Sequence, residues 1–177
     1  MAVAFNNGET RYSNPGTTIS WAYSCSAGSN RLLLSQTSGN GVTVNSGTYA
    51  AAALTNAGST NVLTMWRKIA PTTGSNTLSF TLSSYSRCHA STSDWTGVDQ
   101  TTPLGTKVGN TATNASPSTG SITCPGDGAI FGSVFSGYCT AIPTAGAGTT
   151  LVGSEREGAG GSCKAGGRRS STGAISF

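Results

Sequence analysis

The chain has 177 residues, a length that suits one domain, and it carries ten basic and six acidic residues for a net charge of +4. Serine, threonine, glycine and asparagine make up about half of it, whereas coiled coils and long helices are built mainly from Ala, Leu, Glu, Lys and Arg. Disordered chains combine high charge with few aromatic residues, and this chain has three Trp, five Tyr and five Phe. The composition therefore excludes those classes and favours a globular all-β domain.

The first predicted strand covers residues 17–25, where apolar and polar side chains alternate. Ile19, Trp21, Tyr23 and Cys25 fall on one face, which is the pattern of a strand with one face in a core. Residues 85–95 also read as extended chain, but without a clear core face. Further strands are predicted at residues 32–34, 42–44, 62–69, 78–82 and 129–135.

The remaining segments carry turn and loop signals. Residues 97–117 are predicted to be irregular, followed by a short strand at 120–124 and a turn at 125–128. Residues 153–173 are rich in glycine and alanine, so we expect a long loop there with room for one edge strand. Residues 173–177 are predicted to close the chain as a last strand. The charged residues of the glycine-rich loop are Glu155, Arg156, Glu157, Lys164, Arg168 and Arg169.

These elements predict one fold class and one domain. No stretch of ten or more residues has the helical period, and eight to ten short antiparallel strands are separated by turns. We therefore expect a single β-sandwich over residues 1–177, jelly-roll-like, with long glycine-rich loops, one of them at about 153–173. The sequence contains no internal repeat and no linker.

The cysteines and the chain start bear on where the protein is made. The N-terminal residues lack the basic start and the apolar stretch of a cleaved signal, so we expect synthesis in the cytoplasm without such export. Five cysteines without C-x-x-C spacing then read mostly as small buried hydrophobic residues, although a disulfide such as Cys124–Cys139 stays open. No run of 18 apolar residues is present, and we expect no membrane partner.

The acidic residues are the first candidates for catalysis. They are Glu9, Asp94, Asp99, Asp127, Glu155 and Glu157. We expect a structural role for each: Asp127 lies in a turn, Glu155 and Glu157 lie in the glycine-rich loop, and Asp99 can accept hydrogen bonds from the amides of the threonines that follow it. Asp94 and Asp99 flank Trp95, and the three residues either face a sugar or belong to the fold.

Other catalytic and binding motifs are missing from the sequence. His89 is the single histidine, no G-x-S-x-G motif occurs, and Cys88 and His89 are neighbours that point to opposite faces of a strand. We expect His89 to be a hydrogen-bonded strand residue. The sequence has no metal-ligand spacing and no P-loop, so we predict no enzyme activity, no cofactor and no metal.

One basic cluster is present, and it does not predict nucleic-acid binding. Lys164, Arg168 and Arg169 have no aromatic neighbour, whereas nucleic-acid-binding proteins carry broad basic surfaces. We expect these charges to serve solubility or to pair with an acidic partner surface. The sequon at Asn114-Ala115-Ser116 has no meaning without export.

Several sequence segments together resemble a known family. They are ISW at 19–21, SNRLLL at 29–34, MWRKIAP at 65–71, GSNTLSF at 74–80, WTGVDQTTPLG at 95–105 and CPGDG at 124–128. This order resembles the Ser/Thr/Gly-rich β-sandwich modules of bacteriophage virion proteins and bacterial surface proteins. The resemblance runs over roughly residues 17–138, and it implies no catalytic or metal-binding residues.

Two functions follow from this resemblance as expectations. The first is a structural virion protein, a capsid decoration or cement protein on the capsid surface, whose partners are the major capsid protein and copies of itself, for example in a trimer. The alternative is a carbohydrate-binding module of a tail fibre or cell-surface adhesin. Trp21 and Trp66 occupy core-like strand positions, so a glycan platform would consist of Asp94, Trp95 and Asp99.

Overall fold

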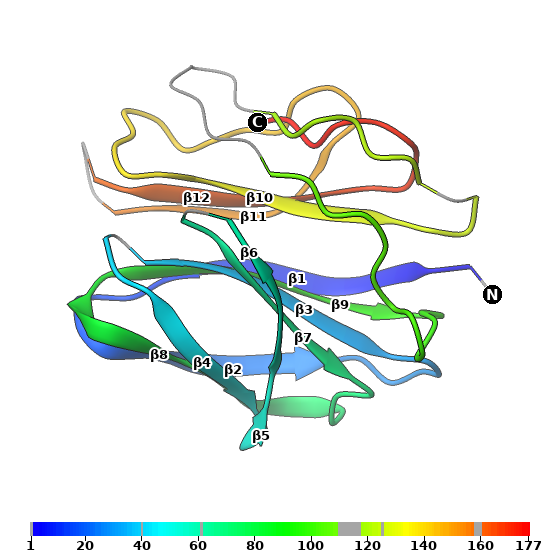
Figure 1. The fold of residues 1–177 in the computed structure, drawn as a ribbon, viewed down its shortest axis with the longest axis horizontal. Coiled ribbons are helices and arrows are strands. Elements are labelled where there is room, and N and C mark those ends of the chain that lie inside the picture. Colours follow the sequence, from blue (N-terminus) through cyan, green and yellow to red (C-terminus); the bar gives the residue numbers. More distant parts are fainter. Residues whose placement is uncertain (1, 40, 61, 110–117, 125, 158–160) are drawn as a thin grey trace.

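The computed structural model describes residues 2–39, 41–60, 62–109, 118–124, 126–157 and 161–177. These residues form three antiparallel sheets and no helix, so the prediction of an all-β chain is confirmed (Figure 1). Twelve strands are described, rather than eight to ten. They are β1 (Ala4–Tyr12), β2 (Gly16–Cys25), β3 (Leu32–Gly39), β4 (Val44–Tyr49), β5 (Ala52–Ala53), β6 (Thr55–Ser59), β7 (Thr64–Ile69), β8 (Gly74–Ser86), β9 (Cys88–Thr96), β10 (Ile130–Ser136), β11 (Thr150–Arg156) and β12 (Cys163–Arg169).

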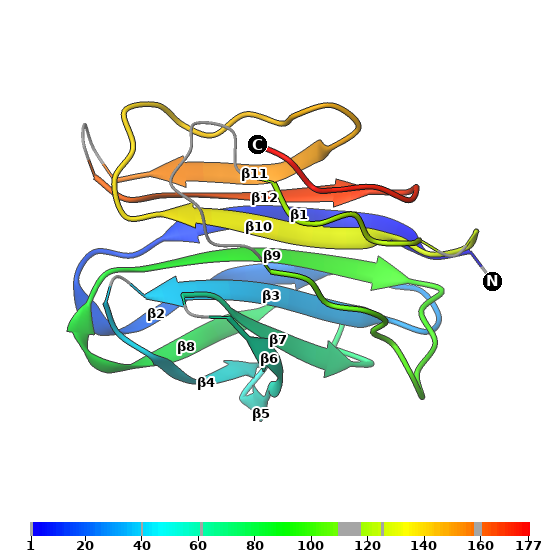
Figure 2. The ribbon, with the colours of Figure 1, turned by 45° about the horizontal axis from the view of Figure 1, so that its top comes forward.

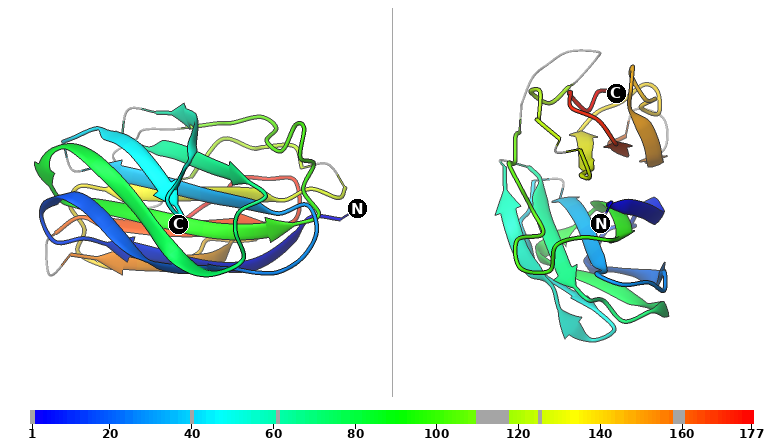
Figure 3. Two further views of the ribbon diagram at one scale, coloured as in Figure 1. Left: turned by 90° about the horizontal axis from the view of Figure 1, so that it is seen from below. Right: turned by 90° about the vertical axis from the view of Figure 1, so that its right-hand side faces the viewer.

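The three sheets are stacked in layers (Figures 1 and 2). The middle sheet has the strand order β1-β9-β3-β7-β6 and lies between a lower sheet of β2-β8-β4-β5 and an upper sheet of β10-β12-β11. The upper sheet packs on β1, β9 and β3 of the middle sheet, and the end-on view in Figure 3 separates the layers. The middle sheet therefore has one face toward each neighbour.

The middle and lower sheets enclose a large apolar core, which we call the lower core. Tyr23, Leu78 and Phe80 are at most 1% exposed within it. The ring of Phe80 packs against Trp21 and Trp66, with centroid distances of 6.0 and 6.1 Å. Burying each large side chain contributes roughly 1.5–3 kcal/mol, so this core is the main stabilising element of the first nine strands.

Strand β2 confirms the alternation predicted for residues 17–25. Ile19, Tyr23 and Cys25 are buried in the lower core, and the half-buried Trp21 packs against it. The intervening residues face solvent, because β2 is an edge strand of the lower sheet with one covered face.

The middle and upper sheets meet through glycine, and we call their contact the upper interface. A Cβ added to Gly166 of β12 would lie 2.9 Å from the Cβ of Ser91. One added to Gly153 of β11 would lie 2.6 Å from the backbone nitrogen of Thr10. Carbon atoms in contact are normally about 3.5–4.0 Å apart, so no larger residue fits at either position without a shift.

Strand β9 is buried on both faces, although small polar residues make up most of it. Every residue of Cys88–Trp95 is buried. Ser91 is 2.9 Å from the hydroxyl of Thr10, and Thr92 is 2.8 Å from the hydroxyl of Ser35. Strands buried on both faces usually consist of continuous apolar residues. Here the buried hydroxyls satisfy one another across neighbouring strands.

The prediction of a loop at residues 153–173 is wrong. Strand β11 ends at Arg156, and β12 is the central strand of the upper sheet, with Cys163 to Gly167 buried. The segment lacks apolar periodicity because it packs through glycine, and periodicity is the signal on which a strand prediction depends.

Residues 120–124 and 173–177 were predicted as strands but form only isolated bridges. Ile122 pairs with Gly173, and Ser118 pairs with Ser176. This pair of segments lies on the outer face of the upper sheet, where Ile175 is fully buried against Gly132. Residues 97–109 contain no strand, as predicted. The sequon lies outside the described residues.

One disulfide joins Cys139 to Cys163, and Cys124 is free. The pairing of Cys124 with Cys139, which the sequence left open, is therefore not present. Cys25 and Cys88 are free and buried, as predicted for small hydrophobic residues.

Candidate functional site

Trp95 does not form a surface platform. It is 4% exposed, and its ring packs edge-on against Phe5 and Phe131, with centroid distances of 5.3 and 6.5 Å. Its Nε1 donates a 2.8 Å hydrogen bond to the hydroxyl of Ser93. A ring that stacks on a sugar must be exposed, so this tryptophan belongs to the upper interface rather than to a glycan site.

The two acidic residues beside Trp95 also have structural contacts. Asp94 is 3% exposed and accepts hydrogen bonds from the hydroxyl of Tyr23 and the backbone N–H of Ser26, both at 3.0 Å. It joins the middle sheet to β2 of the lower sheet. Burial, followed by the nearby Asp94 carboxylate, raises the pKa of Tyr23. The platform predicted for residues 94, 95 and 99 thus has two buried members.

Asp99 is exposed and caps a turn. Its carboxylate accepts from the backbone N–H groups of Thr101 at 2.7 Å and Thr102 at 3.1 Å, as the sequence predicted. These backbone hydrogen bonds hold the pKa of Asp99 below its usual value. Asp99 is therefore a fold determinant, and it does not converge with Asp94.

His89 takes part in a buried chain of polar contacts. Its Nε2 is 2.8 Å from the hydroxyl of Ser162, and that hydroxyl donates to Oε2 of Glu157 at 3.1 Å. Glu157 in turn forms an ion pair with Arg87. Because the single hydroxyl hydrogen of Ser162 goes to Glu157, Nε2 of His89 must be the donor to Ser162. The prediction of a hydrogen-bonded His89 holds for Nε2 only, because Nδ1 has no partner.

The contacts among His89, Ser162 and Glu157 do not have the geometry of a catalytic triad. In a triad the imidazole accepts the serine proton, whereas here the carboxylate of Glu157 accepts it. Ser162 is also 1% exposed, so no substrate reaches its hydroxyl in this structure. Burial lowers the pKa of His89 to about 4, with a further contribution from Lys164, which keeps the imidazole neutral.

Lys164 is buried, contrary to the expected solvated loop. It is 0% exposed in the upper interface, and its Nζ has no hydrogen-bond partner. Burial lowers its pKa to about 7, while the nearby Cys88 acts in the opposite direction. Burial also raises the pKa of the Cys88 thiol to about 12. No sequence signal marked this lysine, because the small residues that flank it, Ser162-Cys163 and Ala165-Gly166, show no apolar periodicity.

The predicted basic cluster does not form one surface. Arg168 lies over the ring of Phe5, 4.4 Å from its centroid. Arg169 donates to the carbonyl of Ala174 at 3.1 Å. With Lys164 buried, the three cations have three different environments. Lys164 and Arg168 face the middle sheet, and Arg169 bonds within the upper layer.

Two exposed tyrosines and one exposed isoleucine lie on segments at one end of the molecule. We call these three residues, Tyr85, Tyr138 and Ile142, the tyrosine end. Their exposed fractions are 72%, 70% and 49%. Tyr85 lies near the β8–β9 junction, and the other two follow β10. The Arg87–Glu157 ion pair and the Cys139–Cys163 disulfide join these segments to the end of β11 and the start of β12. The β8–β9 turn and the end of β10 lie at the left of Figure 1. No sequence pattern marked these three residues.

The described residues contain no group of three or more His, Cys, Asp or Glu side chains placed to hold a metal ion. They also contain no helix long and apolar enough to cross a membrane.

Comparison with known proteins gave no match to a family model, to a curated protein or to a solved structure.

Proposed function

We propose that this protein is a structural virion protein, a capsid decoration or cement protein that bridges neighbouring subunits of a phage shell. The observation that carries the proposal is the tyrosine end, where two tyrosines are more than two-thirds exposed and Ile142 is about half exposed. Tyrosine is enriched among residues that dominate the binding energy of protein interfaces, because it offers a large rigid surface and a hydroxyl. This end therefore suits a protein partner.

The order of the strands supports the same proposal by analogy. In the middle sheet β1, β9, β3 and β7 are neighbours, and in the lower sheet β2, β8, β4 and β5 are neighbours. Two interlocked Greek keys in this order make a jelly roll, a fold found in viral capsid and lectin domains. We propose that the middle and lower sheets form a jelly roll. Because a fold by itself does not specify a function, the exposed residues of the tyrosine end carry the functional part of the proposal.

Binding to the shell would depend on the surface area buried at each contact and on the number of contacts that one oligomer makes. A specific protein interface buries about 1,000 Å² or more, and the three side chains of the tyrosine end would form only its centre. A closed oligomer such as a trimer would present three such ends to the shell and strengthen binding without new contacts. The major capsid protein and copies of this chain are thus the proposed partners.

The direct test is quantitative mass spectrometry of purified particles. We expect a ratio of this chain to the most abundant shell protein near one, or near a simple fraction of it. A handful of copies per particle would instead point to the tail. Absence of the chain from particles would overturn the proposal of a virion protein.

A second test addresses the surface. We expect Tyr85→Ala combined with Tyr138→Ala to weaken co-sedimentation with shells lacking this protein by on the order of tenfold or more. The matched control is Leu151→Ala, which truncates an exposed apolar residue at the opposite end of β11. An equal loss in both proteins would contradict a role of the tyrosine end.

Glycan binding is the alternative, and it now depends on the same two exposed rings because Trp95 is buried. Retention on immobilised glycans that Tyr138→Ala abolishes, with no binding to shells, would favour this alternative.

A further inference from the structure

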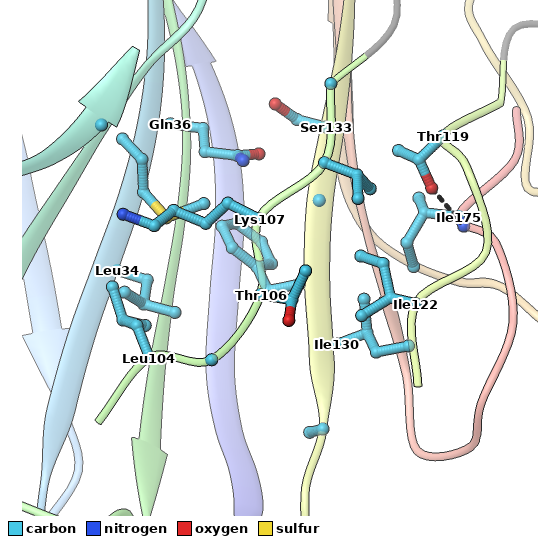
Figure 4. Close-up of a pocket in the computed structure, with 18 of the residues that line it drawn as sticks. Leu34, Gln36, Leu104, Thr106, Lys107, Thr119, Ile122, Ile130, Ser133 and Ile175 are labelled. Atoms are coloured by element: carbon cyan, nitrogen blue, oxygen red, sulfur yellow. Dashed lines mark hydrogen bonds between the residues drawn. The ribbon is translucent and has the colours of Figure 1, made fainter. Parts of the chain in front are cut away.

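A cavity of about 770 Å³ lies beside β10, between the upper sheet and β3 of the middle sheet. Figure 4 shows its two sides, with Leu34 and Gln36 of β3 on one side and Ser133 of β10 on the other. The segment that carries Leu104 and Lys107 crosses in front of it. The volume falls in the range of about 300–1,000 Å³ that is usual for small-molecule sites.

The walls of the cavity are mainly apolar. Alternation along β3 turns Leu32, Leu34 and Gln36 toward the upper sheet, while Leu33 faces the lower core. Phe131 of β10, whose ring contacts Trp95, and Leu104 of the crossing segment line the space from the other side. Ile122, Ile130 and Ile175 line its extension past β10, on the outer face of the upper sheet (Figure 4). An apolar molecule lying against these walls would have part of its surface removed from water.

Two polar atoms in these walls have no hydrogen-bond partner. They are Oε1 of Gln36 and the hydroxyl of Ser133, and neither atom is exposed to solvent. Ser133 as a whole is 9% exposed. Figure 4 shows the two side chains pointing toward each other across the space. Buried polar groups in folded proteins nearly always have a partner, so two unpaired groups that face one cavity suggest a ligand.

The charged groups at the cavity are already engaged. The ammonium of Lys107 donates to the carbonyl of Ala57 in β6, which anchors the crossing segment to the middle sheet. The carboxylate of Asp99 caps its own turn. Val62 and Val108, which are 46% and 37% exposed, also line the cavity and provide an apolar approach from solvent. Among the described lining residues, a charged ligand would meet no free charge of opposite sign.

We propose that this cavity binds a neutral, elongated apolar molecule with one hydroxyl group, of the class of long-chain aliphatic alcohols. The aliphatic chain of the ligand lies against Leu34 and Leu104. Its hydroxyl donates to Oε1 of Gln36 and accepts a hydrogen bond from the hydroxyl of Ser133; both atoms are closed to solvent in this structure, so the two side chains turn toward the ligand when it binds. This site is separate from the tyrosine end, so the inference does not depend on the role in a phage shell.

The binding test uses the intact protein and the neutral fluorescent probe N-phenyl-naphthylamine. We expect its fluorescence to rise with the protein at a one-to-one ratio and to be displaced by dodecanol. Dodecane, which lacks the hydroxyl, and dodecanoate, which is charged, should each displace it at least about fivefold more weakly, because each leaves polar groups of the site unpaired. Absence of a fluorescence change with folded protein would overturn the proposal.

Two variants locate the site. Ser133→Ala and Gln36→Leu should each reduce the preference for dodecanol over dodecane by about fivefold and leave the affinity for dodecane the same or higher. The matched control is Ser136→Ala, on the same strand but outside the cavity, which should leave the preference unchanged. If Ser133→Ala and Gln36→Leu both kept the wild-type preference, the probe would be bound elsewhere and the proposal would be wrong.

A third variant fills the space. Leu34→Trp should abolish the fluorescence change while thermal unfolding confirms a folded protein. Should Leu34→Trp fail to fold, the Ser133→Ala and Gln36→Leu results alone decide the proposal.

Discussion

The middle sheet makes two very different contacts with its neighbours. In the lower core large apolar side chains such as Phe80 and Leu78 interdigitate, and Asp94, which lies at this core, is fully hydrogen-bonded. In the upper interface the sheets approach through Gly153 and Gly166, and Lys164 is buried without a partner. One sheet is thus covered in two ways, by apolar side chains on one face and by the close approach of small residues on the other. The second solution leaves less apolar burial and more unpaired polar groups.

We predict first that the lower core contributes more to the free energy of unfolding than the upper interface does. Phe80→Ala should lower the free energy of unfolding by about 3–5 kcal/mol, because it removes a fully buried ring between Trp21 and Trp66. Phe131→Ala, which truncates a half-buried ring of the upper interface, should cost less. Urea unfolding followed by tryptophan fluorescence measures both. Equal losses would show that the two interfaces contribute alike.

The second prediction concerns pH and the upper interface. The folded pKa of Lys164 is about 7 and the unfolded value is about 10.5, so the unfolded chain binds the proton first as the pH falls. Stability should therefore decrease from pH 9 to pH 7 by about 1.4 kcal/mol per pH unit, and the Lys164→Met variant should lose this slope. Below pH 7 both states are protonated and this contribution is constant.

Other titrating groups at this interface set the controls for that experiment. His89, with a folded pKa of about 4, should cause a separate loss of stability between pH 6.5 and pH 4, and this step should persist in Lys164→Met. The raised thiol pKa of Cys88 lowers stability as the pH rises above 9, so the comparison is made below that value. An unchanged slope in Lys164→Met would mean that Lys164 is not buried in solution.

The third prediction tests how closely β12 of the upper sheet approaches β9 of the middle sheet. Gly166→Val should destabilise the protein by about 1–3 kcal/mol, because its side chain would overlap Ser91. Gly105→Val is the control, since a Cβ there meets no atom within 4 Å. Thermal unfolding measures both variants. If Gly166→Val were as stable as the control, the upper sheet would lie farther from β9 than the structure has it.

The smallest expected effect concerns the buried hydroxyl pairs. Breaking the Thr10–Ser91 pair with Ser91→Ala should cost about 1 kcal/mol, and so should breaking the Ser35–Thr92 pair with Ser35→Ala. Double-mutant cycles with Thr10→Val and Thr92→Val would measure the coupling directly. The two pairs lie on opposite faces of the middle sheet, because Ser91 and Thr92 are consecutive strand residues. If only one pair showed a coupling energy, the two faces would differ in their polar contacts as well as in their apolar contacts.

The all-β class and the strands that have one face in the lower core could be predicted from the sequence alone. Strands β2 and β8 alternate because one face meets apolar side chains and the other meets water, and this difference is written into successive residues. The turn at Asp99 was also predictable, because its carboxylate bonds to the amides that directly follow it. These features depend on residues that are adjacent in the sequence or on the alternation of apolar and polar side chains along a strand.

The upper interface and the residues that face it could not be predicted without the three-dimensional arrangement of the sheets. Burial of Trp95 depends on Phe5 and Phe131, which are far from it in the sequence, and burial of Lys164 depends on the placement of β12 over β9. Glycine at Gly166 carries no apolar signal, since what it contributes is the absence of a side chain. Contacts made by close approach leave no periodic pattern, and so the third layer, its buried lysine and the cavity beside it appear only when the sheets are stacked.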